Sequence, residues 1–227
     1  MGISKDDVKD VVFATVKGAV SATPLVGGLL SEYIGLAQEK VANKRMTEWI
    51  QLIEDKLQKL SSRFDELTES EFFYSCVQLA TGNAMRAYQR EKRQLFANAL
   101  YNSVVIDLDQ DKKLFFMSLL DQYTLTGIKL LKYYSENHYN DDDYVRNCGM
   151  VVTHISLGTE NPIKHVLENN PEFNRASEYM ISLSEQLMGD SLIYPIDFKI
   201  PESPKQARRK RTTKLGDEFL QFIFCNE

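Results

Sequence analysis

The fold is decided by residues 71–104, EFFYSCVQLATGNAMRAYQREKRQLFANALYNSV. Apolar and small side chains recur along this stretch at steps of three and four residues, which places them on one face of an α-helix. These side chains are Phe73, Cys76, Val77, Ala80, Ala84, Ala87, Tyr88, Phe96, Ala99, Leu100 and Val104. The opposite face carries Arg86, Arg90, Glu91, Lys92 and Arg93. The pattern predicts one amphipathic helix of about nine turns, buried along one side and exposed along the other.

The start of this helix is marked by Thr68-Glu69-Ser70-Glu71. A threonine followed three residues later by a glutamate is typical of a capping box, in which each side chain satisfies a free amide of the first turn. We therefore expect Thr68 to be the N-cap.

Composition and charge describe an ordinary globular protein of 227 residues, 43% hydrophobic and 26% charged, with a net charge of -5. The net charge argues against a surface devoted entirely to nucleic acid. One short segment nevertheless concentrates positive charge, on Lys205, Arg208, Arg209, Lys210, Arg211 and Lys214. The sequence thus predicts one basic patch on an acidic body.

No cofactor, metal or enzyme motif stands out. The three cysteines are widely spaced, which favours a reducing cytoplasm over a disulfide framework, and no two histidines have the spacing of zinc ligands on one helix. The common phosphate-binding, dinucleotide-binding and hydrolase motifs are missing from the sequence. Arg146-Asn147 followed by His154 is similar to the active-site motif of helical RNases, although its spacing is longer than in that family. We expect a non-enzymatic protein, with an RNase as a lesser alternative.

Residues 11–37 are the most apolar stretch, with Lys17 and Glu32 as their charged members. The uncharged part, residues 18–31, is shorter than the roughly eighteen residues of a spanning helix and contains Pro24. We therefore expect two helices here instead of a single membrane span.

The first of these helices is expected over about residues 5–20, and the second from Thr23, as N-cap, to Leu60. The inward side chains of the second helix are expected to include Tyr33, Ala37, Val41, Trp49, Leu52, Ile53, Leu57 and Leu60. The helix pair could pack in the core, or leave it to contact a membrane or a partner protein. The residues proposed for such a contact are Val20, Leu25, Val26, Leu29 and Leu30.

Further helices are predicted beyond residue 104. Asp109 marks one start and Thr124 another, while Asn161 and Asn170 each precede a proline, a common way to begin a helix. The predicted helices begin near residue 109 and cover about residues 126–135, 162–168 and 172–188, the last stopped by Gly189.

Extended segments are predicted between and after these helices. They are expected at residues 150–155, 192–194 and 196–198, followed by a basic loop over residues 200–212 and a last helix over residues 213–224. This order is that of a winged helix, with the basic loop as the wing.

The predicted fold is mainly α. Residues 1–123 would form a helical domain with long amphipathic helices, and residues 124–227 a small winged-helix-like α/β unit with a basic wing at residues 203–214. The wing could contact nucleic acid or be a solvated loop. Glu172, Glu178 and Glu185 on the helix that would read bases favour a protein contact instead.

Several stretches together resemble bacterial proteins related to the abortive-infection alpha group. They are the glycine-rich helix pair that ends in residues 45–60, residues 91–100, residues 116–134 and the closing TKLGDEFLQFI of residues 213–223. The resemblance implies a cytoplasmic, helical protein associated with phage defence, and it transfers no functional residue.

The expected function is therefore that of a non-enzymatic defence or accessory protein that acts through protein contacts, as a complex or a homo-oligomer. Conditional association with the inner membrane through the amino-terminal helix pair belongs to this hypothesis. Nucleic-acid binding by the wing is the alternative.

Overall fold

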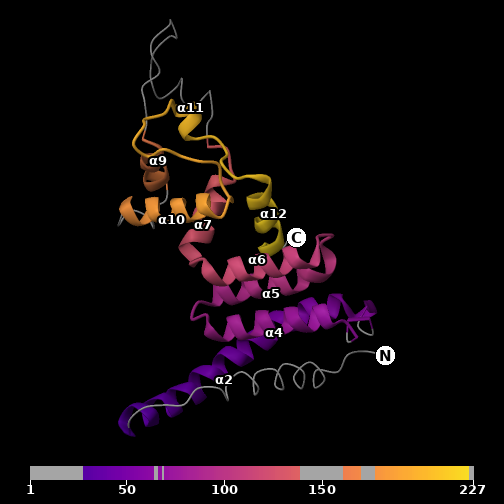
Figure 1. The fold of residues 1–227 in the computed structure, drawn as a ribbon. Coiled ribbons are helices and arrows are strands. Elements are labelled where there is room, and N and C mark those ends of the chain that lie inside the picture. The colour runs from indigo at the N-terminus through magenta and orange to yellow at the C-terminus, as the bar shows by residue number, and fades with distance from the viewer. Residues whose placement is uncertain (1–27, 64–65, 68, 139–160, 170–176, 225–227) are drawn as a thin grey trace, which may run out of the picture. The chain divides into compact units, whose positions relative to one another are not determined.

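The computed structural model describes residues 28–63, 66–67, 69–138, 161–169 and 177–224 (Figure 1). Within these ranges the regular structure is helical, and a mainly helical fold is confirmed. The helices are α2 (Gly28–Lys59), the short 3-10 helix η1 (Ser61–Arg63), α4 (Glu71–Arg86), α5 (Arg90–Val105), α6 (Gln110–Gln122), α7 (Leu125–Tyr134), α9 (Pro162–Asn169), α10 (Ser177–Gly189), α11 (Pro204–Ala207) and α12 (Lys214–Ile223).

The chain divides into two compact units. Unit 1 contains the described residues up to Gln122 together with those from Gln221 onward, and unit 2 is Tyr123–Leu220. The expected boundary after residue 123 lies beside this division, but the expected second domain included the end of the chain.

The single nine-turn helix predicted over residues 71–104 is wrong. The chain leaves the helix after Arg86 and begins a new one at Arg90, and the intervening Ala87 and Gln89 have extended backbones, with ψ of 120° and 129°. α4 and α5 then pack against each other as a helical hairpin (Figure 1). Periodicity did not reveal the break, because each helix has an apolar stripe of the same period and no glycine or proline separates them.

α5 is the central helix of unit 1 and packs against α2, α4 and α6. Most of its length is buried, including polar residues at both ends of the helix. Lys92 is 8% exposed and Arg93 is 4% exposed, so the prediction that they face outward is wrong. A helix surrounded by three others has no fully solvated face.

α2 contributes a deep anchor to unit 1. Trp49 and Ile53 are fully buried, as expected, and the Trp49 indole Nε1 donates to the Thr81 hydroxyl at 3.2 Å. Val41 is 44% exposed, against the expectation that it faces inward. The predicted first helix and the Thr23 cap lie outside the described residues.

Local caps define most helix starts. Ser70, and not Thr68, is the N-cap of α4, since its hydroxyl accepts from the Phe73 amide at 3.2 Å. The expected starts near Asp109 and Thr124 are confirmed, because Asp109 accepts from the Asp111 amide at 3.0 Å and Thr124 from the Gly127 amide at 3.1 Å. The start at Asn161 is also confirmed, with a bond from the Ile163 amide at 3.0 Å.

The last turn of α12 belongs to unit 1 and is held by two asparagines of α5. Asn98 Nδ2 donates to the Ile223 carbonyl at 3.0 Å, and Asn102 Nδ2 donates to the Phe222 carbonyl at 2.8 Å. Carbonyls at the end of a helix have no partner within it, so these amides satisfy them. The ring of Phe222 also packs on that of Phe116, 5.7 Å between centroids.

In unit 2, α10 packs against α7 and α9. The Tyr134 hydroxyl lies 3.0 Å from the Ser184 hydroxyl, and Tyr123 donates a short hydrogen bond to Asp190. α10 ends at Gly189 as expected, but the left-handed residue of the following turn is Ser191, with φ of 59°.

The described part of unit 2 does not support the predicted winged-helix-like α/β arrangement. Where strands were expected after Gly189, Ile193 and Thr212 form a single isolated antiparallel bridge. The basic loop contains a helical turn, α11. The other predicted strand, residues 150–155, lies outside the described residues, as does the beginning of the predicted helix over residues 172–188.

Candidate interaction site

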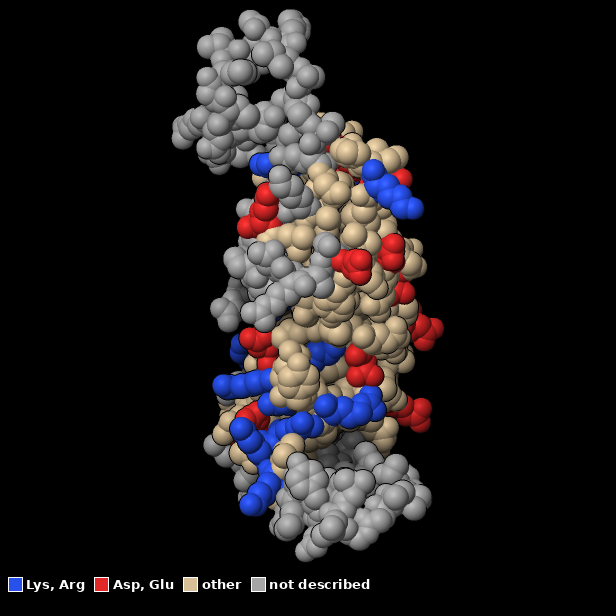
Figure 2. Space-filling model, turned by 90° about the vertical axis from the view of Figure 1, so that its left-hand side faces the viewer, with Lys and Arg blue, Asp and Glu red and all other residues tan. Residues whose placement is uncertain are grey.

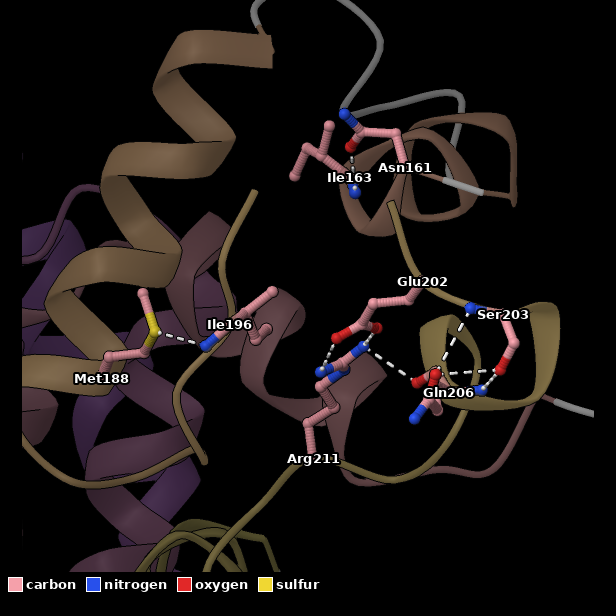
Figure 3. A network of polar contacts seen from close by, with 8 residues as sticks. All are labelled: Asn161, Ile163, Met188, Ile196, Glu202, Ser203, Gln206 and Arg211. Carbon is pink, nitrogen blue, oxygen red and sulfur yellow. Dashed lines mark hydrogen bonds and ion pairs between the residues drawn. The ribbon is translucent and has the colours of Figure 1, made fainter. Parts of the chain in front are cut away.

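The predicted wing is a structured loop in which Arg211 is a buried anchor (Figure 3). Arg211 is 1% exposed, forms a two-pronged ion pair with Glu202 and donates to the Gln206 carbonyl at 2.9 Å. Its backbone amide donates to the Tyr134 carbonyl at 2.7 Å. Arg211 therefore holds the loop in place and is not displayed to a ligand.

Two more of the predicted wing cations are paired with carboxylates. Lys210 Nζ lies 2.7 Å from an Asp217 oxygen, and Lys214 Nζ lies 3.9 Å from a Glu218 oxygen. Lys205 and Arg209 are exposed, and Arg208 is half-buried. The six predicted residues thus differ in their surroundings: Arg211 is a buried anchor, Lys210 and Lys214 form surface ion pairs, and the other three are exposed or half-buried.

The other contacts around the loop are also structural. Ser203 and Gln206 bond to each other around the first turn of α11, with 3.0 Å between the Ser203 hydroxyl and the Gln206 amide oxygen (Figure 3). The Ile196 amide donates to the Met188 sulfur at 3.1 Å. These bonds fix the backbone of the loop on unit 2.

The remaining predicted sites fall largely outside the described residues. Val20, Leu25 and Val26 do so entirely, whereas Leu29 and Leu30 lie in α2 with side chains that the structure does not describe. Arg146, Asn147 and His154, the residues of the RNase alternative, also lie outside. Among the described helices, none is both long and apolar enough to cross a membrane.

A different basic cluster gathers where α4 is connected to α5. We call it the hairpin-end cluster. It consists of Arg86, Tyr88, Arg90, Lys92 and Arg93 in and beside the connection, of Arg45 of α2, which reaches the Met85 carbonyl, and of Lys40 and Lys44, which precede Arg45 along the same helix. The side of the molecule that carries this connection faces the viewer in Figure 2, and Lys and Arg side chains form a band there.

Two guanidinium groups fix the end of α4. Arg45 donates to the Met85 carbonyl and Arg93 donates to the Ala87 carbonyl, each at 2.7 Å. A helix carboxyl end carries partial negative charge and unpaired carbonyls, which explains why arginines are placed there. Behind them, Arg93 forms a short ion pair with Glu48 of α2.

α6 closes the other side of the cluster through Asp121. One Asp121 carboxylate oxygen lies 2.9 Å from Arg86, and the Asp121 carbonyl accepts from Lys92 Nζ at 3.4 Å. Burial lowers the pKa of Lys92 to about 8, although the charge of Asp121 opposes this effect. Lys92 and Arg93 thus lie inside the cluster, and their donors are directed at protein oxygens.

The outer part of the cluster is exposed. Lys40, Lys44, Arg86 and Arg90 are exposed cations, and Tyr88 between the last two is 77% exposed. The cluster holds seven cationic side chains. The carboxylates within residues 40–48, within residues 86–93 and on the contacting part of α6 are Glu48, Glu91 and Asp121, and Glu39 precedes Lys40 along α2. Glu48 and Asp121 are occupied by Arg93 and Arg86. A net positive, water-accessible surface that carries an exposed aromatic ring is suited to binding an anion.

Cys76 and Tyr134, two side chains with shifted pKa values, are buried instead. Cys76 is fully buried, and burial raises the pKa of its thiol to about 11 against lowering effects of Ser103 and Lys113. Burial likewise raises the pKa of Tyr134 to about 12. Both groups are therefore protonated at neutral pH and enclosed by protein. No cluster of acidic, histidine or cysteine ligands for a metal forms among the described residues.

Comparison with known proteins gave no relative. The chain matches no family model, no curated protein and no solved structure. The resemblance to abortive-infection proteins therefore stays a prediction.

Sequence reasoning missed the hairpin-end cluster because it treated Arg86 to Arg93 as the solvated face of one helix. A signal was present: this segment lies between two apolar stripes and carries four cations against one carboxylate, Glu91. Charge concentrated between two stripes can indicate a connection between helices as well as a face. The contribution of α2, some forty residues earlier in the chain, leaves no such local signal.

Proposed function

We propose that this protein is a non-enzymatic bacterial defence or accessory protein that works by binding, and that the hairpin-end cluster is its contact surface for an anionic partner. The observation that carries the proposal is the arrangement of cations at the α4–α5 connection. Buried Arg93 and half-buried Arg45 use their charge on protein carbonyls, whereas Lys40, Lys44 and Arg90 extend into solvent.

Binding is favoured over catalysis by the state of the reactive groups. A cysteine nucleophile acts as a thiolate and needs access to its substrate. Cys76 has a raised pKa and no exposed surface. Its place in the core of unit 1 suits packing instead.

The hairpin-end cluster is favoured over the basic loop of residues 205–214 for electrostatic reasons. A phosphate or carboxylate ligand gains most from cations whose charge is not already neutralised. In the loop, Lys210, Arg211 and Lys214 are paired with carboxylates. In the cluster, the paired cations are those that hold the helices together.

The proposal is tested by reversing charge in one place and not in another. The variant Lys40→Glu/Lys44→Glu/Arg90→Glu changes three exposed cations of the cluster, and Lys199→Glu/Lys205→Glu/Arg209→Glu makes the same change on exposed cations of unit 2. We expect the first variant to elute from a heparin column at much lower salt than the parent protein. The second should elute close to the parent. Equal weakening by both variants would show that only net charge matters, and would contradict the proposal.

The defence role is tested separately in cells. Bacteria that carry the gene should show reduced phage plating, and the cluster variant should lose this protection while the unit 2 variant keeps it. Unchanged plating across a panel of phages would contradict the defence role.

A further inference from the structure

We infer that the anionic partner is single-stranded nucleic acid, and that Tyr88 is the platform on which a base stacks. This inference rests on the proposed function and narrows it. It starts from Tyr88, the most exposed of the large hydrophobic side chains in the described residues, at 77%.

Tyr88 is displayed by the backbone of the connection. Ala87 before it and Gln89 after it both have extended conformations, so Tyr88 lies outside both helices. Most other tyrosines with described surroundings bury their rings or bond their hydroxyls, as Tyr123 and Tyr134 do. A large aromatic side chain left in water at a helix connection contributes little to the fold, which leaves it available for a ligand.

The charges beside Tyr88 suit a phosphate backbone. Arg90, two residues after Tyr88, is an exposed cation, as is Lys44 of α2, a helix that contacts both α4 and α5. Arg86, two residues before Tyr88, is also exposed, but it pairs with Asp121. Proteins that bind single strands combine cations that follow the phosphates with aromatic rings that stack on the bases. Arginine adds a planar group that bonds phosphate oxygens in pairs.

A duplex is the poorer fit. Its bases are stacked on one another and show only their edges in the grooves, so Tyr88 would have no base face to cover. The groove is normally entered by a helix or a strand pair, whereas the cluster offers a three-residue connection between two helix ends. An acidic protein partner could pair with the cations of the cluster, but it has no nucleobase to stack on the Tyr88 ring.

The inference is tested with Tyr88→Ala and Tyr88→Trp on the full chain. Fluorescence anisotropy measures the binding of a labelled oligothymidine. A length of about fifteen nucleotides lies within the site sizes of proteins that bind single strands. Tyr88→Ala should weaken this binding about tenfold, since stacking of one base is worth about five- to 150-fold in affinity. Tyr88→Trp should bind as well as the parent. Tyr194→Ala, which removes another exposed tyrosine at 56%, should have no effect.

Salt dependence separates stacking from charge. Tyr88→Ala removes no charge, so the slope of log affinity against log salt should stay constant. Arg90→Gln should lower that slope by about 0.7, the value for one phosphate contact on a single strand.

The outcomes also separate this inference from the proposed function. Heparin has no bases, so Tyr88→Ala should leave heparin elution unchanged. A protein that binds heparin through the cluster, but prefers duplex or is insensitive to Tyr88→Ala, would overturn the inference and leave the proposed function standing. A parent protein that binds neither heparin nor oligonucleotide would overturn both.

Discussion

At the residue scale, the ion pair between Arg93 and Glu48 supports the hairpin end from within. The Arg93 side chain is 5% exposed and that of Glu48 is 23% exposed. Removing one partner of a buried pair leaves the other charged and desolvated, which costs on the order of 3 kcal/mol. We expect Glu48→Gln to lower the free energy of unfolding by about this amount, measured by urea unfolding.

A matched control for this change is Glu66→Gln. Glu66 pairs with Arg63 at 3.5 Å, but both side chains are more than half exposed. Such surface pairs contribute about 0.5 kcal/mol or less. Equal losses in the two variants would mean that burial of the Arg93 pair has no energetic consequence.

Lys92 gives the stability of the protein a specific pH dependence. Burial lowers its pKa from 10.5 to about 8, so between these pH values the unfolded chain binds more protons than the folded one. The contribution of Lys92 to the free energy of unfolding therefore rises as the pH rises from about 8 to 10.5. It is lowest below pH 8, where Lys92 is charged in both the folded and the unfolded chain. We expect Lys92→Met to be more stable than the parent at pH 7 by up to about 3 kcal/mol.

Urea unfolding of the parent and Lys92→Met at pH 7 and pH 10 measures this difference, which should shrink at the higher pH. The exposed Lys44→Met serves as control and should show no such trend. A stability difference that does not change with pH would rule out the ionisation of Lys92 as its cause.

At the element scale, α12 is placed against the Leu192 backbone by a glycine in its first turn. A Cβ added at Gly216 would lie 2.1 Å from the Leu192 carbonyl oxygen, which is backbone and cannot turn aside. We expect Gly216→Ala to destabilise the protein by about 1–3 kcal/mol, as overpacking does, despite the better helix propensity of alanine. Thermal unfolding measures this effect.

Gly82 is the matched control, since it lies within α4 and has nothing within 4 Å of an added Cβ. Gly82→Ala should stabilise the protein by about 0.5–1 kcal/mol, because alanine loses less backbone entropy in a helix. The two substitutions are thus expected to change the free energy of unfolding in opposite directions. If both stabilised the protein, helix propensity alone would explain the result.

The last turn of α12 depends on the asparagines of α5. Asn102→Ala would leave the Phe222 carbonyl without its 2.8 Å bond in a buried place, at a cost of about 1–3 kcal/mol. We expect faster hydrogen exchange in residues 220–224, with little change at the exposed residues 40–44 of α2. Gln78→Ala, which removes an exposed bond to Tyr74, should leave that exchange unchanged. Equal exchange rates of residues 220–224 in the two variants would contradict a role of Asn102 in holding the last turn of α12.

At the scale of the whole molecule, the distribution of charge matters more than its sum. The net charge is -5, yet one end of the α4–α5 hairpin is basic, so anions can be attracted to a protein that is acidic overall. This separation is what the heparin and oligonucleotide experiments measure.

Membrane association also belongs to the whole molecule and stays a prediction. If the apolar amino-terminal residues insert into a bilayer, the full chain should float with liposomes in a density gradient. Leu25→Asp/Val26→Asp should abolish flotation, because charge in the hydrocarbon region is costly, while Lys199→Glu should not. A parent chain that stays at the bottom of the gradient would end the membrane hypothesis.

The sequence by itself determined the features that depend on neighbouring residues. The caps at Asp109, Thr124 and Asn161 and the buried side of α7, with Ile128 and Leu131, were readable because a helix start and a helix face involve residues one to four positions apart. The mainly helical fold follows from many such local signals.

Only the tertiary structure decided the break at Ala87 to Gln89 and the burial of Lys92, Arg93 and Arg211. The Arg93 partner lies 45 residues earlier in the chain, and the Asn98 partner lies 125 residues later. A charged residue has the same appearance in a sequence whether it is solvated or buried, because its state depends on which distant carboxylate or carbonyl the fold brings to it.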